Sequence, residues 1–341
     1  MKNKIILVIM FAILLTGCSK KEKNEINVLN WSSYIPDSII RGFEKSTNIK
    51  VNYSTYSSNE ELLAKVSNSN EGTYDIIFPS DYMVELMINR GMLEKLDKTK
   101  IQNYENINED YMNYEFDKGN KYSLPFLLAT TVIAYNKENI KENISSYNDL
   151  LNPKYKNNIV LIDDQRIVIG AALLACGYDM NSTNEKELKE AEKWLFKLKN
   201  NIKAYDSDSP KNFLISKEVD IALIWNAEAA LAYEENQNIE VVYPEEGIAK
   251  SLDNFAIPKG GKNRENVYKF IDYILKPEVM KQIVESYPYK NVNIKTDRIL
   301  SEKYLLNRAA NINSETINNG YFVKNIGSYI KDYDKLWANI K

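Results

Sequence analysis

Residues 28–36 read VLNWSSYIP, a stretch in which a strand ends and a helix is about to begin. The apolar part closes a predicted strand over 26–31, and the proline opens a predicted helix over 36–46. Between these elements lie Trp31 and Tyr34, two large rings on a loop where burial in a core does not require them. Rings placed at a strand end in this way make the loop a first candidate for a ligand site.

The alternation of strand and helix continues along the chain. In the first half, a capping box of Ser58 and Glu61 starts one helix, and Ser80 can cap the next. The remaining predicted strands lie over 50–56, 74–80, 157–164, 219–225 and 252–260, and the later helices over 166–177, 185–200 and 264–286. This order predicts an α/β protein whose ligand site lies beyond the carboxyl ends of the strands.

Length and composition favour a globular protein of two domains, because 341 residues with 44% apolar and 27% charged side chains can bury more than one core. The net charge is −3, and it becomes −5 when Lys2 and Lys4 are left out. A mildly acidic chain does not suit a nucleic-acid partner, which needs a basic face. It weakly favours a cationic partner through long-range attraction.

The N-terminal residues resemble a bacterial lipoprotein signal. A basic start is followed by an apolar stretch over 5–15 that is too short to span a bilayer, and LLTGC ends it at Cys18. We therefore expect a signal peptide over 1–17, lipid on Cys18 and a charged tether over 18–25. The alternative is a generic signal peptide with an incidental cysteine.

The counts of cysteine and histidine exclude several classes of enzyme. If Cys18 carries lipid, Cys176 is the one remaining thiol, and its apolar surroundings predict an inert core residue. The sequence holds no histidine, so Ser-His-Asp triads, Cys-His pairs and His-bearing zinc sites are impossible. It also lacks the GxxxxGK[ST] pattern of a phosphate-binding loop.

Tryptophan positions separate packing residues from site candidates. Trp194 lies on an amphipathic helix and Trp337 on a short helix near the end of the sequence, so both are expected to pack in the core. Trp31 and Trp225 instead follow strands directly, in LNW and LIW. Equivalent positions in two halves of the chain predict two aromatic walls of one cleft.

Acidic residues fall at the same kind of position. Asp164 ends one strand, Asp253 begins another, and Glu228 lies one turn beyond Trp225. For Glu228, capping of a helix start is as good an interpretation as ligand binding. Carboxylates between aromatic walls suit an alkylammonium, because the acids pair with its charge and the rings gain about 0.5–2 kcal/mol from cation–π attraction.

The chain resembles the periplasmic spermidine/putrescine-binding proteins of ABC importers over essentially its whole mature length. The motifs that carry the resemblance are NWSSYIP, STYSSNE, YDIIFPSDYMV, DDQRIVIGAAL, IWNAEAA and LDNFAIPKG. The resemblance implies a protein that is exported and then lipid-anchored at the outer face of the cytoplasmic membrane or in the periplasm. It also implies delivery of polyamine to the permease and ATPase subunits of an ABC importer, without a cofactor, a metal or a catalytic residue.

The resemblance further implies a two-lobed periplasmic-binding-protein fold of type II. Each lobe is then a doubly wound sheet with flanking helices, and the ligand cleft lies between the lobes. Crossings are expected near 130–135 and 251–256, where strands lead from one α/β unit into the other. The two lobes are expected to close by a hinge motion at these crossings when ligand binds. The expected boundaries are 26–131 plus 251–298 for lobe I, and 132–250 plus 299–341 for lobe II.

The family's ligand contacts map onto individual positions of this sequence. The ten positions expected to bind ligand are Trp31, Ser32, Tyr34, Ser80, Tyr82, Asp164, Trp225, Glu228, Asp253 and Tyr287.

Four positions depart from the family pattern. Ser33 and Ile167 stand where acids are common, Ser251 replaces a tryptophan, and Val323 replaces a glutamine. A triamine needs a central acid that this chain has lost, whereas a diamine needs only charged ends. We therefore expect putrescine to bind at least as well as spermidine.

Two other functions remain open on the sequence alone. A cleft enzyme with paired carboxylates, such as a glycosidase, would also combine tryptophan and aspartate, and spacing in sequence does not measure the gap between acids. A binding protein for another small solute is the second alternative. An amino acid usually requires an arginine, for which the site loops offer Arg166, and related iron sites favour an adjacent tyrosine pair that is absent.

Overall fold

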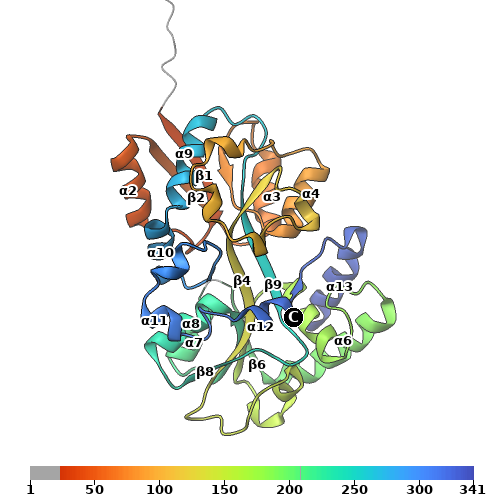
Figure 1. Cartoon of the computed structure of the whole chain (residues 1–341). Coiled ribbons are helices and arrows are strands. Elements are labelled where there is room, and N and C mark those ends of the chain that lie inside the picture. Colours follow the sequence, from red (N-terminus) through yellow and green to blue (C-terminus); the bar gives the residue numbers. More distant parts are fainter. Residues whose placement is uncertain (1–23, 208) are drawn as a thin grey trace, which may run out of the picture.

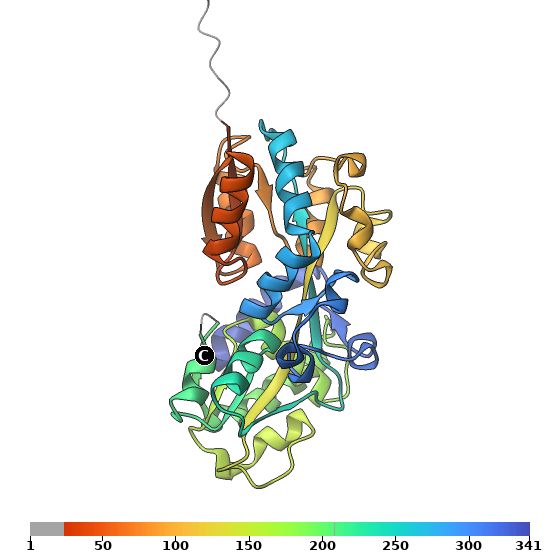
Figure 2. The ribbon, with the colours of Figure 1, turned by 60° about the vertical axis from the view of Figure 1, so that its left-hand side comes forward.

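The computed structural model describes residues 24–207 and 209–341. The predicted signal peptide and Cys18 lie outside these residues. The ribbon forms two α/β lobes joined by the long strands β4 and β9 (Figure 1), and the division is also clear after a 60° turn (Figure 2). The predicted α/β class and two-lobed architecture are confirmed.

The upper lobe in Figure 1 is built on a sheet in the order β2-β1-β3-β9. β1 runs parallel to both β2 and β3, whereas β9 is antiparallel to β3. Its elements up to residue 89 are β1 (Glu25–Trp31), α2 (Asp37–Thr47), β2 (Lys50–Tyr56), α3 (Asn59–Asn68), β3 (Ile76–Ile77) and α4 (Asp81–Asn89). Because these parallel strands are joined by helices, their carboxyl ends lie along one edge of the sheet.

Local sequence explains the first of these helices. α2 buries Ile39 and Phe43, which lie one turn apart on the same face. It ends at Asn48, whose φ of 57° is left-handed and whose backbone N–H donates to the Glu44 carbonyl at 2.8 Å. Asparagine tolerates this conformation, so the helix ends where β2 must begin.

The lower lobe repeats the arrangement in the order β4-β7-β5-β6, with β5 parallel to both β6 and β7. Its elements are β5 (Ile159–Leu161), α5 (Gln165–Ala175), α6 (Glu185–Leu198), β6 (Ile202–Tyr205), α7 (Lys211–Ile215), β7 (Ile221–Trp225), α8 (Asn226–Glu235) and β8 (Ile239–Val242). The predicted strand end at Trp225 is therefore the observed end of β7.

Strand β4 (Ser123–Asn136) belongs to both sheets and is buried along all 14 residues. Residues 123–130 pair antiparallel with β9 (Ala249–Ala256), and residues 131–136 pair with β7 and β8. The backbone thus passes from one sheet to the other between Thr130 and Thr131. A strand covered on both faces favours apolar residues, which the sequence supplies on either side of Thr130 and Thr131.

The chain after β9 contributes to both lobes. α9 and α10 cover the upper sheet, and the last helices pack on the lower lobe (Figures 1 and 2). The remaining elements are α9 (Arg264–Ile274), α10 (Pro277–Ser286), β10 (Lys290–Asn291), α11 (Glu302–Leu306), α12 (Ser314–Asn318), β11 (Tyr321–Phe322) and α13 (Ile330–Ile340).

Short 3-10 helices fill the connections between these elements. They are η1 (Lys98–Lys100), η2 (Tyr104–Asn106), η3 (Glu109–Tyr111), η4 (Glu115–Asp117), η5 (Tyr147–Leu151), η6 (Pro153–Tyr155), η7 (Lys199–Asn201), η8 (Thr296–Arg298) and η9 (Gly327–Tyr329).

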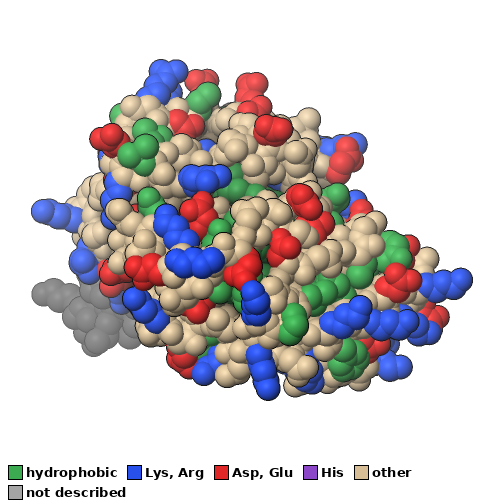
Figure 3. Space-filling model, turned by 90° about the horizontal axis from the view of Figure 1, so that it is seen from below, with side chains coloured by type: hydrophobic (Ala, Val, Ile, Leu, Met, Phe, Trp, Pro, Cys, Tyr) green, Lys and Arg blue, Asp and Glu red, His purple; other side chains and the backbone are tan. Residues whose placement is uncertain are grey.

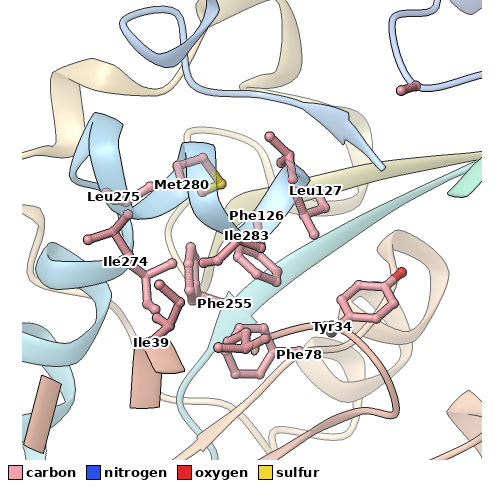
Figure 4. Close-up of a cluster of buried hydrophobic side chains, with 14 of the residues drawn as sticks. Tyr34, Ile39, Phe78, Phe126, Leu127, Phe255, Ile274, Leu275, Met280 and Ile283 are labelled. Carbon is pink, nitrogen blue, oxygen red and sulfur yellow. The ribbon is translucent and has the colours of Figure 1, made fainter. Parts of the chain in front are cut away.

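A cluster of phenylalanines forms the centre of the upper core. The rings of Phe78, Phe126 and Phe255 come from three neighbouring segments, with centroids 4.9–5.2 Å apart. Tyr34 extends this cluster toward the lobe boundary (Figure 4), with its ring 6.3 Å from Phe126. The candidate site loop is therefore anchored directly on the core.

Some local predictions differ from the structure. β1 already begins at Glu25, which the expected tether included, because this residue pairs with Lys50 of β2. The predicted strand over 74–80 is reduced to Ile76–Ile77, since Pro79 cannot donate to a ladder. Ser80 precedes α4 but makes no side-chain capping bond, because its hydroxyl is used elsewhere.

The thiol of Cys176 is half-buried at the end of α5, and it is unbonded to another cysteine within the described residues. Burial raises its pKa, which disfavours the reactive thiolate.

Within residues 24–207 and 209–341, the helices are all too short or too polar for a bilayer crossing. On the face seen from below, lysine and arginine side chains are interspersed with aspartate and glutamate (Figure 3). This face is therefore neither uniformly positive nor uniformly negative in charge.

The side chain of Asn226 links three segments at the boundary between the lobes by hydrogen bonds. It is fully buried, and its Oδ1 accepts a hydrogen bond from Thr130 N at 3.0 Å. Its Nδ2 donates to the carbonyls of Ala309 at 3.0 Å and Pro288 at 3.3 Å. One side chain thereby holds the switch point of β4 against two later segments.

We expect Asn226→Ala to lower the free energy of unfolding by about 2–4 kcal/mol, because three buried backbone groups lose their partner. Asn325→Ala is the matched control, since exposed Asn325 accepts only one local bond, from Gly327 N, and its loss should change stability by less than about 0.5 kcal/mol. Denaturant unfolding measures both. Equal effects in the two variants would contradict the role assigned to Asn226.

Candidate functional site

A cavity of about 380 Å³ lies where the parallel strands of both lobes end. A volume of this size is typical of a small-ligand site. Ten residues were predicted to bind ligand. Of these, the ones that line the cavity are Trp31, Ser32, Tyr34, Ser80, Tyr82, Asp164, Trp225, Glu228 and Asp253.

The carboxylate of Asp253 is the most enclosed charged group of the cavity, with only 2% of the residue exposed. It accepts a hydrogen bond from Tyr34 Oη at 2.6 Å and one from Ser80 Oγ at 2.7 Å. Asn59 Nδ2 in turn donates to Ser80 Oγ at 3.1 Å. Asp253 is thus fixed by residues from three separate elements.

Burial raises the pKa of Asp253 to about 7, although the hydrogen bonds from Tyr34 and Ser80 lower it. Burial and the adjacent Asp253 carboxylate also raise the pKa of Tyr34, so its hydroxyl stays protonated and donates. Among the residues that the structure describes, this carboxylate has no cationic side chain as a counter-charge. A bound cation would supply one.

Aromatic rings surround this carboxylate. Trp31 lies 4.6 Å from the Tyr56 ring, and its Nε1 donates to the Phe78 carbonyl at 3.0 Å, which fixes its orientation. The ring of Tyr34 lies 4.6 Å from that of Tyr289. These contacts hold the ring faces of the upper wall in place before any ligand arrives.

Asp164 lies on the opposite lobe, at the start of α5. Its Oδ1 accepts from the backbone N–H groups of Arg166 at 2.8 Å and Ile167 at 3.2 Å, so it caps the helix as well as lining the cavity. Burial raises its pKa, and the negative charge of Glu60 adds to the shift. Because Glu60 belongs to α3, acids from the two lobes influence each other across the cavity.

Glu228 is neutralised by the protein itself. Lys211 Nζ lies 2.9 Å and 3.0 Å from its two carboxylate oxygens, and the Glu228 side chain is only 12% exposed. Burial raises the pKa of Glu228, while Lys211 opposes the shift. Sequence analysis left open whether Glu228 caps a helix or binds ligand, and did not foresee this lysine partner.

Comparison with known proteins shows the family to which the chain belongs. The family model for bacterial extracellular solute-binding proteins matches residues 38–304. The chain belongs to this family. It is 35% identical over 331 residues to the spermidine/putrescine-binding periplasmic protein of Escherichia coli (strain K12), which covers 97% of this chain and 95% of that protein.

Two further relatives extend the comparison. The putrescine-binding periplasmic protein SpuD of Pseudomonas aeruginosa (strain UCBPP-PA14) is 30% identical over 320 residues, covering 88% of this chain and 87% of that protein. The solved structure of a putative spermidine/putrescine ABC transporter from Listeria monocytogenes is 34% identical, with a TM-score of 0.88. That match covers 93% of this chain and 98% of the other.

One position predicted to bind ligand, Tyr287, lies outside the cavity lining, whereas Tyr289 is part of it. Tyr289 N donates to the Tyr287 carbonyl at 2.7 Å, which closes a tight turn around Pro288 after α10. This turn decides that the ring of Tyr289 lines the cavity, and the local sequence around Pro288 does not encode that choice.

The departures from the family pattern all lie at the cavity wall. Ser33, Ile167, Ser251 and Val323 are lining residues, so their exchange changes the ligand's surroundings directly. Ser33 has a left-handed φ of 54°, a conformation that leaves its short side chain on the exposed rim. These four residues are uncharged, so this part of the wall carries no charge of its own.

Sequence reasoning missed several acids and rings of the wall. Glu60, at the start of α3, accepts a hydrogen bond from Tyr82 Oη at 3.1 Å. It directly precedes Glu61 of the predicted capping box, and its position beside a strand end was the available indication. The other lining residues not predicted as ligand contacts include Tyr56, Ser57, Ser58, Asn59, Ala129, Ile162, Asp163, Gln165, Ser207, Tyr289, Asp334 and Trp337.

Trp337 was expected to be a core residue only. It packs against the lower core, but its half-buried ring also lines the cavity. α13 lies far from the other site elements in sequence, and only the fold of the last segment brings it to the cavity. Trp194, by contrast, is buried at 6% exposure as expected.

Arg166 lines the cavity, but its guanidinium forms hydrogen bonds with other groups of the protein. Its Nη1 donates to the Lys324 carbonyl and its Nη2 to Asn181 Oδ1, both at 3.0 Å. The guanidinium also lies 4.9 Å from the Tyr333 ring. An arginine held by these three groups is poorly placed to receive a ligand carboxylate.

A second cavity of about 490 Å³ lies beside β8 and the segment before α12, away from the strand ends. Its acid, Glu240, is paired with Arg308 at 3.3 Å, and Tyr243 Oη donates to the Arg308 carbonyl at 2.7 Å. The acid and the arginine of this second cavity therefore already pair with each other. The cavity around Asp253 is the better candidate for the ligand site.

We expect Asp253→Asn to stabilise the ligand-free protein, and more so at high pH. The folded pKa is about 7 against an ordinary value of 3.8, so the folded state holds the proton more tightly than the unfolded chain. The stability contributed by protonated Asp253 is present below pH about 4 and is lost as the pH rises to about 7. The gain of the variant should be larger by about 2–3 kcal/mol at pH 8 than at pH 5.

Denaturant unfolding at these two pH values tests the expectation. Asp37→Asn serves as the control, because the Asp37 side chain is 91% exposed and its variant should follow the pH dependence of the parent. A gain from Asp253→Asn that is the same at both pH values would show that Asp253 does not titrate between them.

Proposed function

We propose that this protein is the substrate-binding component of an ABC importer and that it binds a polyamine, putrescine or spermidine, in the cavity around Asp253. The family match and the names of the relatives support the class of function. The relative of known structure from Streptococcus pneumoniae is named a spermidine/putrescine ABC transporter substrate-binding protein, at 33% identity and a TM-score of 0.82.

The observation that carries the proposal is the buried carboxylate of Asp253 between two hydroxyl donors and several ring faces. Both donors come from the protein, and the carboxylate lacks a positive partner among the described residues. An ammonium would restore the balance of charge, and rings such as Trp31 would cover the adjoining methylenes. Polyamines combine these two chemical features.

The opposite lobe supplies the second anchor. Asp164 and Glu60 approach the cavity from different lobes and raise each other's electrostatic energy when both are ionised. A cation between them relieves this repulsion, so ligand binding favours closure of the lobes. The same residues that select an ammonium would thereby drive the hinge motion expected of a two-lobed binding protein.

The alternatives fit the site less well. A solute with a carboxylate would meet Asp253, Asp164 and Glu60, while Arg166 is held by other groups. A carboxylate-based enzyme such as a glycosidase would need two acids placed for catalysis, and the relatives are named as binding or transport proteins. We infer that the protein is not an enzyme, and a turnover assay against glycosides tests this.

Export and attachment belong to the same proposal. The relatives from Escherichia coli and Pseudomonas aeruginosa are named periplasmic proteins, and the start of this sequence resembles a lipoprotein signal. We infer that Cys18 carries lipid and that the charged segment after it tethers the lobes outside the cytoplasmic membrane. The permease and ATPase subunits of the importer are the expected partners.

The wall composition favours the shorter polyamine. Ile167 offers no charge to a central ammonium, and Val323 offers no hydrogen bond to an outer one. Burying an ammonium without a partner costs several kcal/mol, whereas a methylene beside Ile167 costs nothing. Ser33 and Ser251 leave room for water, which would reduce the difference.

We expect Asp253→Asn to weaken putrescine binding by about 2–5 kcal/mol, because a buried ammonium loses its counter-charge. The double variant Lys211→Met with Glu228→Gln should change it by less than about 1 kcal/mol, since this pair is already neutral. Calorimetric titration compares the variants. A larger loss in the double variant than in Asp253→Asn would transfer the anchoring role to Glu228.

We further expect putrescine to bind at least as tightly as spermidine, and both to bind far more tightly than amino acids, sugars or ferric iron. Calorimetry across this small panel tests the function itself, and competition between the two polyamines tests the preference. A spermidine affinity more than tenfold above that of putrescine, about 1.4 kcal/mol, contradicts the preference. Binding of a different solute class in place of polyamines contradicts the function.

A further inference from the structure

An ammonium group of the protein already lies at the outer end of the cavity. Lys341 Nζ forms an ion pair with Asp163, and it lies 5.0 Å from the Trp337 ring and 5.2 Å from the Tyr205 ring. One carboxylate and two aromatic faces are the groups expected around a polyamine ammonium. We call Asp163, Tyr205 and Trp337 the outer box.

The outer box is built from three elements. Tyr205 ends β6, Asp163 follows β5, and Trp337 lies on α13. The two rings meet edge to face, with centroids 5.2 Å apart and planes at 77°, so they form a corner around the ammonium. Burial and the Asp163 charge raise the pKa of Tyr205 to about 12, which shows that the acid lies close to this ring.

The outer box is continuous with the cavity, because Asp163 and Trp337 both line it. Asp163 directly precedes Asp164, and consecutive Cα atoms are about 3.8 Å apart. Asp334, one turn before Trp337, also lines this end and accepts from Gln165 Nε2 at 3.0 Å. A chain of methylenes that passes Asp164 therefore reaches a second acidic and aromatic position.

We propose that the outer box is an additional ammonium subsite of the polyamine cavity, which Lys341 occupies when the ligand is too short to reach it. The inference rests on the proposed function, since it concerns the outer end of the same ligand. Putrescine, with two ammonium groups, fills the inner positions and leaves Lys341 in place. Spermidine, with a third, competes with Lys341 for the outer box.

The Lys341 contact is weak enough to be displaced. The Lys341 and Asp163 side chains are 37% and 39% exposed, and ion pairs in this setting contribute little net stability. Displacement returns the lysine ammonium to water, where its charge is solvated. The competition therefore reduces the affinity for a triamine without abolishing its binding.

The test compares spermidine and putrescine affinities by calorimetry in the full chain and its variants. We expect Lys341→Gln to raise spermidine affinity about 3–10-fold, because the outer box becomes free for the third ammonium. Putrescine affinity should change less than about twofold. Lys335→Gln is the control of equal charge, because Lys335 is exposed on the same helix and does not line the cavity.

A second variant identifies the box itself. Adding Asp163→Asn to Lys341→Gln should remove the gain for spermidine, because the subsite loses its carboxylate. A gain that persists in this double variant, an equal gain for putrescine, an equal effect of Lys335→Gln, or no gain at all would each overturn the proposal.

The outcomes separate the two proposals. A parent protein that binds putrescine but shows no selective gain contradicts the outer subsite alone. A parent protein that binds neither polyamine contradicts the proposed function together with the subsite that rests on it.

Discussion

The structure depends on one buried carboxylate whose charge the protein leaves unmatched. Asp253 accepts hydrogen bonds from Tyr34 and Ser80, is 2% exposed, and has a pKa raised to about 7 by burial. Such a group destabilises the ligand-free fold when it is ionised. The surrounding framework must therefore hold it rigidly, and the phenylalanine core beneath Tyr34 and the fixed loop after β1 do so (Figure 4). An ionised carboxylate in this position is the group that the proposed binding of a cation requires.

The two sheets explain why aromatic and acidic groups converge there. Parallel strands present their carboxyl ends at one edge, and β4 joins the two sheets so that these edges face one cavity. Trp31 ends β1 and Ser80 follows β3, while Asp164 follows β5 and Trp225 ends β7. Each lobe thus carries part of a binding wall, and the passage of β4 between Thr130 and Thr131 aligns them.

The cavity wall contains more acids than a diamine needs, and the protein neutralises two of them with its own lysines. Lys211 pairs with Glu228, and Lys341 pairs with Asp163. Among residues 24–207 and 209–341, no lysine pairs with Asp253 or Asp164. Ser33 and Ile167 add no charge to the wall, whereas Glu60, Asp163 and Asp334 bring charge from other elements. Which acids of the cavity wall stay unpaired therefore depends on the fold, because the fold brings the lysines to their partners.

The sequence by itself determined the α/β class, the strand ends at Trp31 and Trp225, and the placement of Asp164 just after a strand. These features depend on local periodicity and on the rule that strand ends bear ligands, both of which are written in neighbouring residues. Asp253 was expected to begin a strand over 252–260, but it lies in the middle of β9 (Ala249–Ala256), because pairing with β4 starts the strand earlier. The tertiary structure alone decided which tyrosine enters the cavity, that Trp337 lines it, and which acids meet a lysine. Asp163 and Lys341 are separated by 178 positions, and the turn around Pro288 moves Tyr289 into the place expected for Tyr287. Contacts of this kind arise from packing between distant segments, which local patterns do not encode.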